Sequence, residues 1–161
     1  MPGVDAVGGR PLKVTVTGGG PVGLAFALLL ESLVSGGVSI DVYDDRWMEE
    51  AGRIVWQGEK QLNARRHQVV TIQSRHYLRL PADVRGRVFQ GGCYSEMWPQ
   101  GPDSIGGCGP RNVRIAHFED QLLALANEKA GRIQLIARRF DPEEDRANGH
   151  HLTEGGIVVV A

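Results

Sequence analysis

Hydrophobic and polar residues alternate in short runs along this chain, and the first run is the clearest. Val14 and Val16 flank a threonine, which is the period-two pattern of a half-buried β-strand. The apolar stretch that follows predicts a buried helix over residues 21–34, and a second alternating run predicts a strand over residues 38–44. This start favours an α/β protein with a largely parallel sheet and helices on both faces.

The remainder of the chain continues with short strands and helices. We predict strands over residues 68–72, 113–115, 133–137 and 157–160. We predict helices over residues 74–80, 82–89 and 117–130, the first two separated by a proline. We interpret residues 46–60 as a polar connection, 91–110 as a long loop and 141–145 as an acidic turn. Residues 1–11 are expected to form a flexible tail, which leaves residues 12–161 as one domain.

Three spaced glycines join the first predicted strand to the helix. Gly18 lets the chain turn sharply, Gly20 has no Cβ to block a pyrophosphate, and Gly23 lets the helix lie close to the sheet. Backbone amides at the helix start, around Pro21 and Val22, would then face the phosphates, because the helix dipole favours negative charge there. The spacing is the dinucleotide-binding fingerprint.

An acidic residue ends the second predicted strand. The carboxylate of Asp44 can accept hydrogen bonds from both hydroxyls of an adenosine ribose and would repel a 2′-phosphate. Asp45 is the neighbour that could replace it. The alternative from these residues alone is a glycine turn in an ordinary α/β protein with a surface aspartate.

Composition narrows the class of protein. A net charge of −1 gives no general attraction to nucleic acid or to an anionic membrane, and no apolar run is long enough for a membrane span. The two cysteines, Cys93 and Cys108, lack metal or redox spacing, so we expect reduced thiols in a cytoplasm, with a single disulfide as the alternative. The histidines show no metal-ligand spacing, and no metal site is predicted. The expected partner is a small organic substrate.

From residue 13 to residue 161, this order of motifs resembles the FAD-binding half of the class A flavoprotein monooxygenases, the aromatic hydroxylase type. Within that class, residues 65–72 (RRHQVVTI) and 113–123 (VRIAHFEDQLL) are most similar to the MICAL branch and its microbial relatives. The resemblance implies a Rossmann-like FAD-binding fold, with FAD as cofactor and NADPH or NADH as electron donor. The implied reaction is flavin reduction, oxygen activation, and hydroxylation or epoxidation of an organic substrate, and the oxygen chemistry belongs to the flavin.

The same resemblance implies roles for further residues. Arg46 matches a basic residue near the adenine side of the cofactor, and Arg66 matches an arginine beside the flavin-side phosphate or ribityl chain. The chain departs from the family where Ala116 occupies a position that is often Arg or Gln. Arg114 or His117 would have to supply that contact.

Two other functions fit the first motif: a nucleotide-binding module without turnover, and an NAD-dependent reductase. In the monooxygenase class, a strand like residues 157–161 leads into further cofactor motifs and a sheet that covers the substrate. None of these motifs is in this sequence. We therefore expect the chain to be a fragment or half of a split enzyme that acts with a missing C-terminal portion or a complementary chain.

Overall fold

The main sheet of this protein has four strands, all of them parallel, in the order β8-β2-β1-β9. A computed structural model describes residues 11–34, 36–58, 64–147 and 156–161. The four strands are β1 (Leu12–Thr17), β2 (Val38–Tyr43), β8 (Ile133–Ile136) and β9 (Ile157–Val160). The predicted α/β class with a parallel sheet is confirmed, and the strand order is compatible with a Rossmann-like fold.

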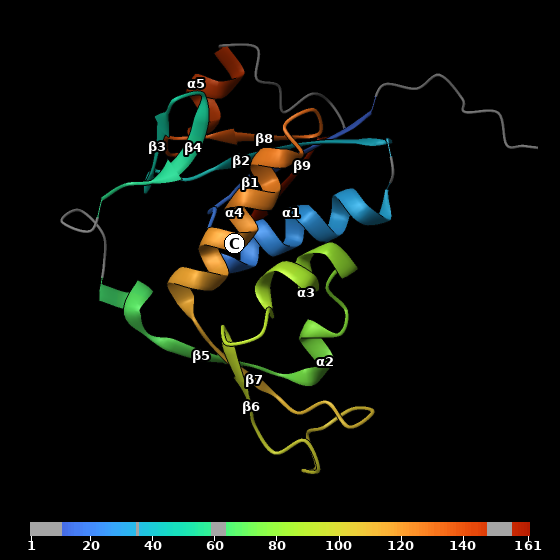
Figure 1. Ribbon diagram of the computed structural model, residues 1–161. Coiled ribbons are helices and arrows are strands. Elements are labelled where there is room, and N and C mark those ends of the chain that lie inside the picture. Colours follow the sequence, from blue (N-terminus) through green and yellow to red (C-terminus); the bar gives the residue numbers. More distant parts are fainter. Residues whose placement is uncertain (1–10, 35, 59–63, 148–155) are drawn as a thin grey trace, which may run out of the picture.

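Two helices cover one face of this sheet. Helices α1 (Pro21–Leu33) and α4 (Ile115–Glu128) pack against each other below the strands in Figure 1. The core lies between them and the sheet, and its fully buried members include Val16, Leu24, Ala27, Ile40 and Leu122. The helix predicted over residues 21–34 is confirmed to within one residue, whereas α4 begins two residues before the predicted start and ends two before the predicted end.

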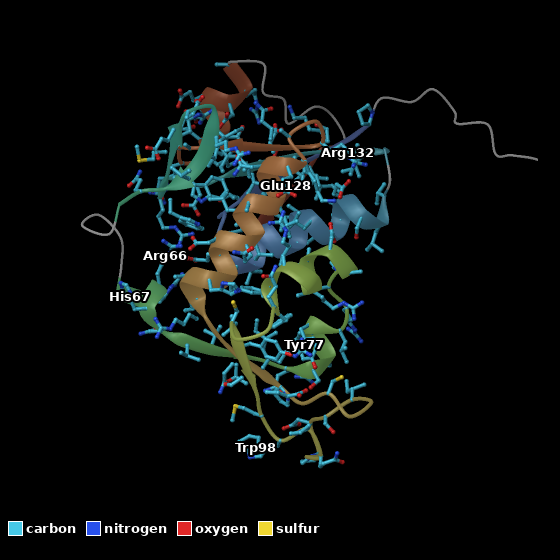
Figure 2. All side chains as sticks on the ribbon, viewed as in Figure 1. Arg66, His67, Tyr77, Trp98, Glu128 and Arg132 are labelled. Atoms are coloured by element: carbon cyan, nitrogen blue, oxygen red, sulfur yellow. The ribbon has the colours of Figure 1, made fainter. Side chains whose placement is uncertain are left out.

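A buried carboxylate links the two core helices. Glu31 in α1 accepts from Lys129 Nζ at 2.8 Å and from Arg132 Nη2 at 2.9 Å, just beyond the end of α4. Arg132 is labelled in Figure 2 beside Glu128, which pairs with Arg87 of the neighbouring helix α3 (Ala82–Val88). These ion pairs fix the distance between α1 and α4 at the ends far from the glycine loop.

A second, antiparallel sheet lies at the opposite end of the molecule from β1 and β2 (Figure 1). Its strands are β5 (Val69–Ile72), β7 (Arg111–Arg114) and β6 (Tyr94–Glu96). A 3₁₀ helix (Ala64–His67) precedes β5, and α2 (Ser74–Tyr77) follows it. The interpretation of residues 91–110 as a loop is wrong for β6, because Tyr94 and Glu96 pair with β7.

The segment predicted as a polar connection contains a β-hairpin. Strands β3 (Trp47–Glu50) and β4 (Arg53–Trp56) are antiparallel, and the turn between them places Ala51 and Gly52 at φ of 50° and 74°. Positive φ at both positions suits the twist of a two-residue hairpin. The prediction for residues 46–60 is therefore wrong over the hairpin, and residues 59 and 60 lie outside the described residues. Asn127 holds the hairpin on α4 by bonding both Ile54 N–H (3.0 Å) and Ile54 C=O (2.9 Å).

The predicted acidic turn is instead a short helix, α5 (Pro142–Ala147). Proline at the first helical position and acidic residues in the first turn favour a helix start, which explains the difference. Asp145 of α5 is buried and accepts from the hydroxyl of Tyr43, at the end of β2, at 3.0 Å. The tail predicted over residues 1–11 lies outside the described residues except for Pro11.

Candidate functional site

The glycine loop follows β1 directly and is shaped by close backbone contacts. Gly18 has φ of 105°, and a Cβ there would lie 2.3 Å from the carbonyl oxygen of Ala161 beside it. A Cβ on Gly23 would lie 1.9 Å from the carbonyl oxygen of Gly18. A side chain at either position would therefore strain the fold itself, because the nearest neighbouring atoms are backbone. Gly23 was predicted to bring the helix close to the sheet, and the contact that it makes is with the loop that directly follows β1.

Gly19, between the first two glycines of the fingerprint, contacts the hairpin. A Cβ on Gly19 would lie 2.0 Å from the indole of Trp47, which packs against the loop and is 1% exposed. Trp47 in turn meets Trp56 edge to face, with 6.0 Å between ring centroids. The hairpin thus supports the glycine loop from one side.

The start of α1 is open to a ligand. Gly20 is the N-cap, no side chain caps the first turn, and the first turn holds no acidic residue. Pro21 occupies the first helical position, and Val22 is 70% exposed. Helix starts with free amide groups and no competing carboxylate bind anions well.

Asp44 lies next to this loop and is almost fully buried. One carboxylate oxygen accepts from Gly19 N–H (2.8 Å) and Arg46 Nη2 (2.5 Å), and the other accepts from Arg46 N–H (2.8 Å) and Arg46 Nε (2.9 Å). Burial raises the pKa of Asp44, but the hydrogen bonds from Arg46 and Gly19 outweigh it and hold that pKa below its usual range. The carboxylate is therefore ionised at neutral pH.

A depression of about 360 Å³ opens at the carboxyl ends of β1 and β2. Four predicted site residues line it: Gly18, Asp44, Asp45 and Arg46. The sequence analysis did not place the other four in a site: Thr17, Tyr43, Arg139 and Phe140. Asp45 is exposed at this rim and has no hydrogen bond to the glycine loop among the described residues. Asp44 is thus the acid that contacts the loop.

Arg66 lies in a second cluster. Its Nε donates to the carboxylate of Glu119 at 2.8 Å, its Nη2 pairs with Asp120, and its guanidinium lies 4.8 Å from the ring of Trp56. Figure 2 shows Arg66 at the side of α4. The guanidinium of Arg46 lies 5.2 Å from the same ring, so Trp56 connects the two clusters.

Glu119 is a site residue that the sequence analysis missed. It is 1% exposed, and its Oε1 has no hydrogen-bond partner among the described residues. Burial raises the pKa of Glu119, and the neighbouring arginines, Arg66 first, oppose the rise without cancelling it. Its position between Phe118 and Leu122 on an otherwise apolar helix face was the available signal.

The three residues weighed for one cofactor contact, Arg114, Ala116 and His117, lie apart from one another in their contacts. Ala116 offers its backbone carbonyl to Arg66 Nη2 at 3.4 Å, and His117 turns away to bond the carbonyl of Val88 at 2.9 Å. Arg114 is exposed at the end of β7. Glu119 and Asp120 are thus the side chains of α4 that pair with Arg66.

Other chemistry is limited in the described part of the chain. Cys93 and Cys108 are free thiols. No cluster of His, Cys, Asp or Glu there could hold a metal ion. None of the described helices combines the length and the apolar character that a membrane span requires.

We compared the sequence with protein-family models and with curated proteins. No protein-family model matches the sequence, and no curated protein matches it.

Proposed function

We propose that this chain binds FAD and is the FAD-binding portion of a flavin-dependent monooxygenase. The observation that carries the proposal is the hydrogen bond from Gly19 N–H to Asp44, which joins the glycine loop of β1 to the acid that follows β2. In open α/β sheets, ligands bind in the crevice outside the carboxyl ends of the strands. Gly20, which is half-buried, and the uncapped start of α1 lie at that position.

The residues fit an adenosine diphosphate group. Amide groups at the start of α1 would bind the pyrophosphate, since Gly20 leaves room for it. Asp44 would bind the ribose hydroxyls, and the depression lined by Arg139 and Phe140 has room for the adenosine end of the cofactor.

The choice of FAD and of a monooxygenase reaction rests on the sequence resemblance. Bound FAD would supply electron transfer from NADPH or NADH and oxygen activation. The chain itself would bind and orient the cofactor. Arg66 is suited to its flavin-side phosphate because Glu119 and Trp56 fix the guanidinium.

The test is a titration of FAD fluorescence with the purified chain and two variants. Gly20→Val should lower FAD affinity by steric exclusion yet fold normally, because the new Cβ would meet only the flexible end of Arg46, at 3.2 Å. Gly58→Val is the matched control, since no atom of the described residues, chain neighbours aside, lies within 4 Å of a Cβ there. Asp44→Ala should weaken FAD binding by roughly 10- to 100-fold through loss of charge-assisted hydrogen bonds.

The absorbance spectrum of the purified protein complements this titration, because bound flavin is yellow and NAD is not. FAD affinity that is the same in wild type, Gly20→Val and Asp44→Ala would refute the assignment. Binding of NAD without FAD would instead favour the reductase alternative.

A further inference from the structure

The carboxylate of Asp44 is saturated with hydrogen bonds in this structure. A carboxylate offers about four acceptor positions, two on each oxygen. Asp44 receives four donors: the backbone N–H groups of Gly19 and Arg46, and Nε and Nη2 of the Arg46 side chain. A ribose that binds to Asp44 must therefore displace a donor already there.

The distribution of these donors determines which one can leave. Each oxygen carries one backbone donor and one guanidinium donor. The backbone donors belong to the glycine loop and to the turn between β2 and β3. The Arg46 side chain is 27% exposed and pivots on a flexible stem. Its departure would free one position on each oxygen, which is the arrangement that the two hydroxyls of a ribose need.

The same guanidinium already stands beside the phosphate path. Its Nη2 lies 3.2 Å from the point where a Cβ of Gly20 would be, and among the described residues, chain neighbours aside, no other atom lies within 4 Å of that point. The face of Trp56, 5.2 Å from the guanidinium carbon, gives a flat surface along which it can turn. Arg46 is thus between two groups that an adenosine diphosphate would bring: the ribose at Asp44 and the phosphates at Gly20.

We propose that Arg46 exchanges partners when the nucleotide binds: its guanidinium leaves Asp44 to the ribose hydroxyls and pairs with the pyrophosphate over Gly20. The inference rests on the proposed nucleotide-binding function and assigns to Arg46 two opposed effects. Toward a ligand that has a ribose but no phosphate, Arg46 is a competitor. Toward a ligand that also has phosphates, it is a ligand-binding residue. An arginine suits this role because its planar fork binds carboxylate and phosphate equally well.

The test compares adenosine with ADP on wild type and on Arg46→Met, which keeps the aliphatic stem on Trp56 and removes every donor of the guanidinium. Calorimetry or NMR titration should show adenosine binding more tightly to Arg46→Met than to wild type. ADP should bind about tenfold more weakly to Arg46→Met, because a charge-assisted contact is lost. Arg139→Met, in the same depression but without a bond to Asp44, is the matched control and should change both affinities in the same direction or not at all.

A spectroscopic measurement on wild type covers the case of a variant that does not fold. The ¹⁵N signal of Arg46 Nε should shift on addition of either ligand, since both displace the guanidinium from Asp44. Tighter binding of both ligands by Arg46→Met, weaker binding of both, or an unmoved Nε signal would overturn the exchange while leaving the proposed function intact. Absence of ADP and FAD binding to wild type would overturn both.

Discussion

Gly23→Ala is the substitution for which the structure makes the most quantitative prediction. The added Cβ would lie 1.9 Å from the carbonyl oxygen of Gly18, 3.1 Å from its carbonyl carbon and 3.3 Å from Cβ of Ala161. Two of these three atoms are backbone, so no side-chain rotation relieves the contact. The helix and the glycine loop would have to separate by about 1.5 Å to reach ordinary van der Waals distance.

Two opposing terms set the size of the effect. Overpacking of this kind costs about 1–3 kcal/mol. Replacement of glycine by alanine inside a helix returns at most about 1 kcal/mol, and less in the first turn, where Gly23 lies. We expect a net loss of about 1–2 kcal/mol in the free energy of unfolding, which for a domain of this size lowers the melting temperature by roughly 2–8 °C. Nucleotide affinity should fall as well, because a displaced Gly18 would move the glycine loop that is proposed to bind the phosphates.

Gly86→Ala is the matched control, since Gly86 lies in α3, is exposed and has open space around its Cα. There the same chemical change should stabilise the protein by about 0.5–1 kcal/mol, because only the helix-propensity term remains. Urea unfolding of wild type and both variants, with ADP titration of each, measures the two effects. A Gly23→Ala protein as stable as wild type and equal to it in ADP affinity would refute the packing argument.

Two further predictions concern buried polar groups. Because burial raises the pKa of Glu119, its ionised form disfavours the folded state, and this unfavourable contribution sets in as the pH rises through the ordinary range of a glutamate. Glu119→Gln should therefore gain stability relative to wild type between about pH 4 and pH 7 in urea unfolding, and a constant difference over that range would contradict the sign. Tyr43→Phe should lose about 1 kcal/mol by removing the donor to Asp145, which keeps its pairing with Arg138, and thermal unfolding that matches wild type would show that this bond contributes nothing.

The parts of the fold that depend on local pattern were predictable from the sequence. The alternation around Val14 and Val16 predicts β1, the glycine spacing predicts the loop, and the apolar run after it predicts α1. These three signals follow one another directly in the sequence. The hairpin was missed because charged residues surround Trp47 in its first strand, and because its turn begins with alanine where glycine or asparagine is the usual signal.

The candidate site was predictable only in part, for a related reason. Asp44 was predicted because it ends the alternating run of residues 38–44, a pattern that the sequence displays. That Arg46 bonds to both of its oxygens depends on side-chain directions that no periodicity encodes. Glu119 and Arg66 lie 53 positions apart in the sequence, so their ion pair exists only in the folded chain.

The packing of Trp47 on Gly19 should couple these two positions in evolution, because their side chains compete for the same space. A side chain at position 19 has room only if position 47 holds a smaller one, so the change at position 47 must come first. Glycine at 19 and tryptophan at 47 should consequently be gained or lost together, even though position 19 is the variable one in the dinucleotide fingerprint.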